Sequence, residues 1–359
     1  MFKMLIDWYK KKFSDPAAIT LFGILIAGFL LIYFGAELLA PILLALVLTY
    51  ALEWPVTKLE QIKINRGFSV AIVLTLFCSL LLFSMIGLIP LIWEQGSNLI
   101  NELPTMVNKT QSWAWELHNQ YPQYIDSEHL NLISKNLQNS VLNIGQTFVF
   151  NSISSLASLL TVLIYSVVVP LLVFFFLKDK KYLIESASKF FPSNMHLATQ
   201  VKDEMNSQIK NYIQGKLLEI IIVGIATYIF FVVINLPYAA LLEFFVGLSV
   251  IIPYVGAVLV TIPVILVGLF HFGITADFGY LILGYLIIQA IDGNILVPIL
   301  FSEAVNLHPA VIIIAVLIFG GLWSFWGVFF ASPLATLVKA VISAWPKSEH
   351  LEKEKTSAA

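Results

Sequence analysis

The chain has 359 residues, of which 59% are hydrophobic and only 12% are charged, and its mean hydropathy is +0.88. An average soluble domain carries about 25% charged residues, so this composition argues against a water-soluble globular protein. The formal net charge of −2 argues against a nucleic-acid binder, which would have a strongly basic face. The single cysteine, Cys78, cannot form an internal disulfide.

Apolar runs long enough to cross the ~30 Å hydrocarbon core of a bilayer recur from one end of the chain to the other. They lack the alternation of barrel strands, so they predict helices. We therefore predict an all-α polytopic membrane protein with about eight transmembrane helices, the first two joined by a tight hairpin at residues 35–37. The predicted spans cover residues 19–36, 37–54, 69–93, 152–177, 217–236, 239–270, 278–300 and 309–343.

The positive charges predict how these spans are oriented. All lysines and arginines except Lys109 and Lys135 lie in four segments, and basic residues are retained on the cytoplasmic side. This pattern predicts a membrane protein with both termini in the cytoplasm. Its predicted parts are 1–93 with spans 1–3, an extracytoplasmic helical loop at 94–151, span 4 at 152–177, cytoplasmic amphipathic helices at 178–216, a transport core with spans 5–8 at 217–343, and a cytoplasmic tail at 344–359.

Carboxylates without basic neighbours mark the carboxyl-terminal half. No lysine or arginine occurs from Leu217 to Val338, whereas this stretch contains Glu219, Glu243, Asp277, Asp292 and Glu303. An ionisable group inside a span is costly and usually faces a cavity or a transport path. Each carboxylate must therefore bind a proton or cation, pair with a distant basic residue, or lie at a wet boundary. We expect the last of these for Glu219 and Asp277, which lie near span ends.

Asp292 is the main candidate for a transport site. It lies centrally in its run, and Gln289 precedes it by one helical turn. Gly293 and Pro298 weaken the helix after it, and Asn294 adds another polar group. Broken helices near the bilayer midplane form solute and ion sites in many secondary transporters. The alternative is that Asp292 and Asn294 only hold helices together by hydrogen bonds.

Two further places carry candidate residues. Pro253, Gly256 and Pro263 interrupt a run of about 32 residues, which as a straight helix would be ~48 Å long and must tilt, kink or project. Glu303 and His308 are close enough in sequence to titrate together, and a histidine can relay protons near neutral pH. A His-Pro turn that caps the final helix is the alternative for His308.

Three segments in order resemble the AI-2E (autoinducer-2 exporter) family of transporters: PYVGAVLVTIP, QAIDGNILVPILFSEAVNLHPAV and FGGLWSFWGVFFASPLATLVKAV. WYKKKFSDPAAI and YALEWPVTKLE are similar to one permease branch of that family. The resemblance implies an oligomeric inner-membrane protein with eight spans. It also implies a link to export of autoinducer-2 and, in some members, to exchange of sodium or lithium for protons. The matching motif positions are Pro253, Gly256, Asp292, Asn294, Pro298, His308 and Pro309.

Together these observations predict a secondary transporter that exports a small solute or ion, with H⁺ or Na⁺ as candidate coupling ions. Its partners are then the lipid bilayer, the solute and further copies of the chain. A passive oligomeric channel or a membrane scaffold is the alternative. The sequence has neither a phosphate-binding glycine loop nor a zinc-protease motif, so we expect no enzyme activity, no cofactor and no metal centre.

Overall fold

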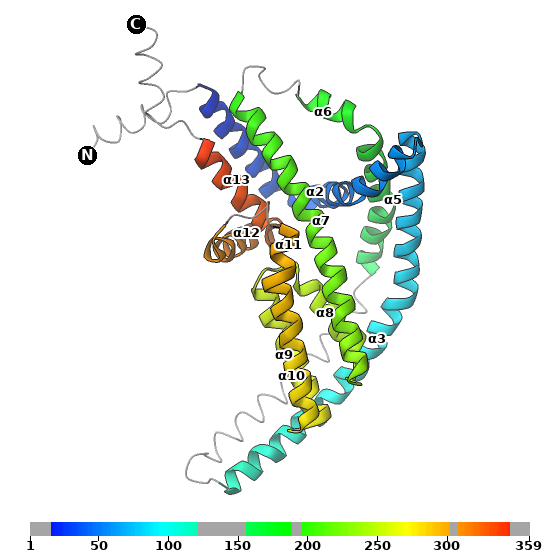
Figure 1. Ribbon diagram of the computed structural model, residues 1–359, viewed down its shortest axis with the longest axis vertical. Coiled ribbons are helices and arrows are strands. Elements are labelled where there is room, and N and C mark those ends of the chain that lie inside the picture. Colours follow the sequence, from blue (N-terminus) through cyan, green and yellow to red (C-terminus); the bar gives the residue numbers. More distant parts are fainter. Residues whose placement is uncertain (1–15, 121–155, 189–195, 302–306, 345–359) are drawn as a thin grey trace, which may run out of the picture.

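In the computed structural model, the described residues, 16–120, 156–188, 196–301 and 307–344, contain helices and their connections (Figure 1). Within these described residues, six helical segments are long and apolar enough to cross a membrane, one of them formed by three successive elements over Ala276–Phe301. The predicted all-α membrane class is therefore confirmed, whereas both termini lie outside the described residues. The helices are α2 (Pro16–Gln61), α3 (Arg66–Gln120), α5 (Leu156–Lys178), α6 (Lys180–Ser188), α7 (His196–Val233), α8 (Ala239–Ser249), α9 (Val255–Phe272), α10 (Ala276–Ile291), the π-helix η1 (Asp292–Leu296), α11 (Val297–Phe301), α12 (Pro309–Phe329) and α13 (Ala331–Ala344).

The hairpin predicted at residues 35–37 is wrong, because α2 runs through this position as one helix of 46 residues. No residue at 35–37 has the positive φ typical of a tight turn. Gly35 is tolerated inside the helix, where an added Cβ would meet only the side chain of Leu39 one turn later. The predicted spans 19–36 and 37–54 are therefore parts of one helix, of which Leu39–Gln61 is the candidate span.

An ionic cluster joins the ends of α2, α3, α5 and α6. Arg66 donates from Nε to the carbonyl of Leu177 (2.8 Å) and from Nη1 to Glu60 (2.9 Å). Glu53 lies between two cations, at 3.4 Å from Arg66 Nη2 and 3.0 Å from Lys180 Nζ. Below the cluster, valine and leucine side chains of α2, α3 and α5 form a separate apolar core. These helices therefore make one unit beside the carboxyl-terminal half.

Helices α8 and α9 fold back on each other as a hairpin against α7. Glu243 of α8 lies against Gly224 of α7, and Gly247, one turn later, lies beside Ile220, so α8 runs antiparallel to α7. Helix α9 runs antiparallel to α10, because Thr261 hydrogen-bonds to Tyr285 and a Cβ at Gly268 would overlap Leu281.

The α10–α11 segment is itself antiparallel to α7. Gly284 packs on Phe230 near one end of α7, and Phe301 packs on Gly215 nearer its middle. Helix α9 consequently runs parallel to α7 and antiparallel to α8, so the α8–α9 tip at 250–254 reaches the middle of α7. Figure 1 shows the α9–α10 turn at the end of the bundle where α7 finishes.

The run predicted as one span at 239–270 is thus two helices with a reversal between them. Pro253 provides no N–H for a continuing helix. Tyr254 has a φ of 62°, in the left-handed region. A Cβ at Gly256 would overlap the carbonyl of Ser249, so only glycine lets the two helices cross this closely. Pro253 and Gly256 are weak points that the sequence marks, and they produce a reversal instead of a kink, whereas Pro263 lies within α9.

Gly256→Ala is expected to destabilise the protein by about 1–3 kcal/mol, because backbone must move to accommodate the new methyl group. Gly279→Ala is the matched control, since nothing lies within 4 Å of a Cβ added to that helical glycine. Alanine there should be neutral or stabilising by up to about 1 kcal/mol. Thermal unfolding of both variants in detergent measures the difference, and equal melting temperatures would contradict the close crossing.

Helices α12 and α13 form a second hairpin where the sequence predicts a single span at 309–343. The chain leaves helical geometry at Trp323 (φ −129°, ψ 17°) and Ser324 (φ 50°, ψ −127°). A Cβ at Gly327 would overlap the carbonyl of Phe319, which a straight helix would hold about 12 Å away along its axis. The two arms of this hairpin pack together through four buried residues: Ala315, Val316, Ala331 and Ala335.

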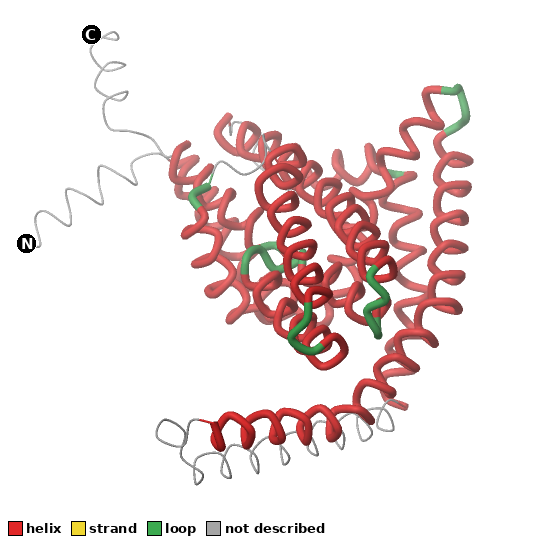
Figure 2. The backbone as a smooth tube through the Cα atoms, turned by 60° about the horizontal axis from the view of Figure 1, so that its bottom comes forward, coloured by secondary structure: helices red, strands yellow, loops and turns green. Residues whose placement is uncertain are grey.

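The two hairpins meet in the middle of the molecule. Ile252, from the α8–α9 tip, packs on the apolar cluster between α12 and α13. Tyr212 of α7 donates a hydrogen bond to the carbonyl of Phe329 at 2.9 Å, which holds the second hairpin to α7. Figure 2 shows these helices gathered in the main body, while α3 extends along one side and beyond it. The meeting point of the hairpins is where the candidate site lies.

The middle of α3 is attached to the base of the α8–α9 hairpin. Gln95 accepts a hydrogen bond from the backbone N–H of Leu241 at 2.9 Å. In the connection between α7 and α8, burial and then the hydrogen bond and charge of Glu102 raise the pKa of Tyr238 to about 12. Tyr238 therefore stays protonated and able to donate at physiological pH. The base of the hairpin is fixed to α3 at two points, and its tip is remote from both.

Candidate functional site

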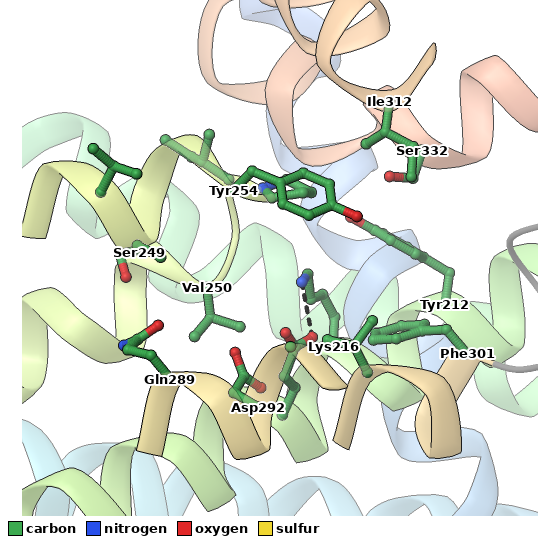
Figure 3. Close-up of a pocket in the computed structure, with 17 residues that line it drawn as sticks. Tyr212, Lys216, Ser249, Val250, Tyr254, Gln289, Asp292, Phe301, Ile312 and Ser332 are labelled. Atoms are coloured by element: carbon green, nitrogen blue, oxygen red, sulfur yellow. Dashed lines mark hydrogen bonds and ion pairs between the residues drawn. The ribbon is translucent and has the colours of Figure 1, made fainter. Parts of the chain in front are cut away.

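A cavity of about 420 Å³ lies at the junction of the two hairpins, α7 and the π-helix (Figure 3). Its size is in the range of pockets that hold small organic ligands. Most of its wall is apolar, and a few charged and polar groups reach into it from α7 and η1. It is lined by Tyr212, Lys216, Glu219, Ser249, Val250, Ile252, Pro253, Tyr254, Ala257, Val258, Gln289, Asp292, Gly293, Val297, Phe301, Ile312 and Ser332.

Helix α7 presents three polar residues to the cavity from one face. Tyr212, Lys216 and Glu219 follow each other at spacings of four and three residues, which places them on the same side of a helix. Lys216 and Glu219 are 5% and 2% exposed, and Lys216 Nζ lies 2.8 Å from Glu219 Oε2. The ammonium of Lys216 also lies over the ring of Phe301, 5.4 Å from its centroid. The pair is therefore fully formed and buried.

Asp292 enters the cavity from the opposite side, at the first residue of η1. The backbone N–H of Val297 bonds to the Asp292 carbonyl, which gives the wider π-helical turn. Such turns often occur at functional sites inside α-helices. Asp292 Oδ1 is buried and has no hydrogen-bond partner. Figure 3 shows this carboxylate beside Lys216 and pointing into the space under Tyr254.

The charges around the cavity do not balance when all three groups are ionised. Lys216 and Glu219 neutralise each other across 2.8 Å. Asp292 is close enough to Lys216 to interact with it electrostatically, but among the described residues no hydrogen bond or ion pair joins the two side chains. One negative charge is therefore left over, on an oxygen that lacks a donor. The arrangement can accept a proton or a cation at Asp292.

Only two of the eight residues predicted for the site line the cavity, namely Asp292 and Pro253. Gly256 lies just behind the wall, at the base of the tip. Glu243 lies between α7 and α8, against Gly224. Glu303 is outside the described residues.

The remaining three predicted residues face away from the cavity. Asn294 donates to the Ala290 carbonyl of its own helix at 2.9 Å, so it does not pair with Asp292. Pro298 is exposed on α11. His308 is the N-cap of α12, where its Nδ1 accepts from the N–H of Ala310 at 3.2 Å, which agrees with the capping alternative.

Lys216 and Glu219 are the residues that the sequence reasoning missed. The sequence predicts Lys216 at the end of a cytoplasmic segment and Glu219 at the membrane boundary, but both lie well inside the candidate span Asn206–Val233. The signal that could have found them is their spacing. A lysine three residues before a glutamate, at the start of an apolar run, can bury as a pair where either residue alone could not.

The comparisons with known proteins agree with a transporter. The sequence pattern described as AI-2E family transporter matches residues 22–347. The chain is 51% identical over 349 residues to "Putative permease PerM" of Escherichia coli strain K12, covering 97% of this chain and 99% of that protein. It is 30% identical over 315 residues to "Putative transport protein YueF" of Bacillus subtilis strain 168, covering 86% and 84%. The resemblance inferred from the motifs is confirmed.

Proposed function

Because this chain belongs to the AI-2E family of transporters, we propose that it is a secondary transporter that exports a small solute or ion across the bacterial inner membrane. Exchange for H⁺ or Na⁺ drives the export. The family match and the apolar helices support a multi-pass membrane transporter. The proposal includes the direction of transport, its coupling to an ion, the inner membrane as the location and an oligomeric state.

The observation that carries this function is the cavity between two helical hairpins, with an unpartnered carboxylate in its wall. Secondary transporters commonly place their sites where helices are interrupted inside the membrane. Here two interruptions line the cavity, at residues 250–254 and 292–296, and the arms of the second hairpin add Ile312 and Ser332. Asp292 begins the second interruption.

The hairpin tip supplies the moving part of the proposed mechanism. Val250, Ile252, Pro253 and Tyr254 cover one side of the cavity. Helices α8 and α9 return to the same end of α7, so the tip can separate from η1 without breaking either helix. Opening on one side and then on the other would expose Asp292 to each compartment in turn. The carboxylate then releases its solute and takes up the coupling ion.

The proposed topology differs from the predicted one in two ways. Helix α2 is one helix, and the runs 239–270 and 309–343 turn back as hairpins. The ionic cluster around Arg66 and Lys180 marks the cytoplasmic end, by the retention of positive charge. Both hairpins return to the side from which they enter. Eight membrane-inserted helices remain the proposed number, and the described residues supply six long candidate spans and two shorter apolar helices, Ile164–Lys178 and Ala239–Ser249. In this arrangement the carboxyl terminus is cytoplasmic, because α10–α11 leads back to that side and the second hairpin returns to it.

Flux in proteoliposomes tests the function. Vesicles with the purified chain and an internal pH dye are loaded with candidate solutes, and proton and sodium gradients are imposed in turn. We expect solute efflux that accelerates with one of these gradients and is accompanied by movement of that ion. Efflux that ignores both gradients would contradict coupled exchange and favour a passive channel. A lack of flux for every solute tested would favour a scaffold.

A further inference from the structure

We propose that the solute carried by this site is a small organic cation, a protonated or quaternary amine attached to an apolar body, with its charge held at Asp292. The inference rests on the proposed function and specifies the substrate class of the same cavity. It follows from the balance of charge, from the chemistry of the walls and from the position of one aromatic ring.

The charge balance favours a cation over an anion. Lys216 is the one basic residue that lines the cavity among the described residues, and its ammonium is already paired with Glu219 at 2.8 Å. An anionic solute would have to compete with that carboxylate for Lys216 and would face Asp292. A cation would neutralise the charge of Asp292, whose buried Oδ1 accepts no hydrogen bond. Bringing an uncompensated charge into an apolar site is strongly unfavourable, and a counter-charge removes much of that penalty.

The walls favour an organic cation over a metal ion as the solute, and by the same argument they favour H⁺ over Na⁺ as the coupling ion. Hard metal cations are held by a shell of several oxygen ligands. No group of three or more histidine, cysteine or acidic residues that could hold a metal ion occurs among residues 16–120, 156–188, 196–301 and 307–344. The Ser249 hydroxyl donates to the Val246 carbonyl at 2.7 Å and can offer a cation a single neutral oxygen. The rest of the lining includes aliphatic side chains that can solvate only an apolar group: Val250, Ile252, Val258, Val297 and Ile312.

Tyr254 provides a second contact for the cation. Figure 3 shows its ring over the cavity, on the side away from Asp292. Its position at the tip is fixed by a left-handed backbone, and the residue is 51% exposed. An ammonium between the carboxylate and the ring face would gain a cation–π interaction in addition to the ion pair. The Lys216 ammonium already makes such a cation–π contact with Phe301, 5.4 Å from the ring centroid, so this geometry occurs within the site.

Binding of matched probes to the purified chain in lipid nanodiscs tests the inference. The probes are pentylammonium, pentanol and pentanoate, which share one apolar body and differ in charge. Calorimetric titrations, corrected with empty nanodiscs, give the affinities. We expect pentylammonium to bind at least ~10-fold more tightly than either of the others, equivalent to a difference of about 1.4 kcal/mol. Equal affinities, or a preference for pentanol or pentanoate, would overturn the inference.

Two variants and one control assign the preference to the site. Asp292→Asn should remove the advantage of pentylammonium, and Tyr254→Leu, at the exposed tip, should weaken its binding by roughly threefold. Asp277→Asn, at an exposed carboxylate in the first turn of α10, should leave all three affinities unchanged. An undiminished preference in Asp292→Asn would overturn the inference. If that variant fails to fold, an unchanged affinity of Tyr254→Leu for pentylammonium would overturn it.

Binding and flux separate this inference from the proposed function. Flux of a neutral or anionic solute by a chain that shows no preference for pentylammonium would overturn the substrate class and leave the transport function standing. Selective binding of pentylammonium without flux of any solute would support the cation site and contradict transport.

Discussion

Asp292→Asn is expected to lower solute flux in proteoliposomes by roughly 10- to 100-fold, because hydrogen bonds to charged groups contribute about 1.5–3 kcal/mol each. The substitution keeps the size of the side chain and removes the charge that the solute and the coupling ion share. The initial rate of efflux, per amount of reconstituted protein, is the measurement. Asp277→Asn is the control with the same chemistry at an exposed site.

The same variant separates the transport role of Asp292 from a packing role. The Asp292 carboxylate has an oxygen without a hydrogen-bond partner, and Asn294 bonds to its own helix, so a packing role has little support in these contacts. We expect Asp292→Asn to be as abundant in the membrane and as monodisperse in detergent as the unchanged protein. Loss of folded protein, with normal flux from the fraction that remains, would show that Asp292 holds helices together and does not carry solute.

Lys216→Met is expected to lower the free energy of unfolding by about 3–5 kcal/mol, because it leaves Glu219 as an uncompensated buried charge. Adding Glu219→Gln should recover most of that loss, since the double variant contains no unpaired charge at this position. SDS-induced unfolding in mixed micelles measures all three proteins. A double variant that is as unstable as the sum of the two single variants would show that the residues act independently.

The exposed pair in the ionic cluster provides the comparison for this result. Lys180 lies 3.0 Å from Glu53, but its side chain is 38% exposed. Solvent screens such pairs, and their contribution is generally below about 1 kcal/mol. Lys180→Met should therefore change the free energy of unfolding far less than Lys216→Met does. Equal effects would mean that burial of the Lys216–Glu219 pair does not determine its contribution.

The helical class and the family could be predicted from the sequence because they depend on composition and local motifs. The two chain reversals could not be predicted, because an apolar run has the same composition whether it crosses the bilayer or turns back within it. Pro253 and Gly256 mark weak points of the first run, but the direction of the chain after them is fixed by packing on α7 and α10. At residues 35–37 the error is the reverse: the sequence predicts a turn where the chain has none, because Gly35 lies inside one continuous helix.

The site could be predicted only where an unusual residue has no local explanation. Asp292 was found because no basic residue follows Leu217 until Lys339. Lys216 was missed because positive charges next to apolar runs are ordinarily cytoplasmic, and only the structure shows that α7 continues as one helix on both sides of it. Glu243 and His308 have equally suggestive chemistry, but tertiary packing places one between two helices and the other at a helix cap.

Labelling of a cysteine in the cavity wall tests most directly whether this cavity opens to the two sides of the membrane in turn. The native Cys78 is first replaced by serine, and Ser249→Cys then provides a thiol in the cavity. Ile225→Cys, on the exposed apolar face of α7, is the control that a membrane-impermeant reagent should not reach. We predict labelling of Ser249→Cys from one side at a time, with the accessible side changed by solute or by the coupling ion. Labelling from both sides under the same conditions, or from neither side under any condition, would contradict the transporter.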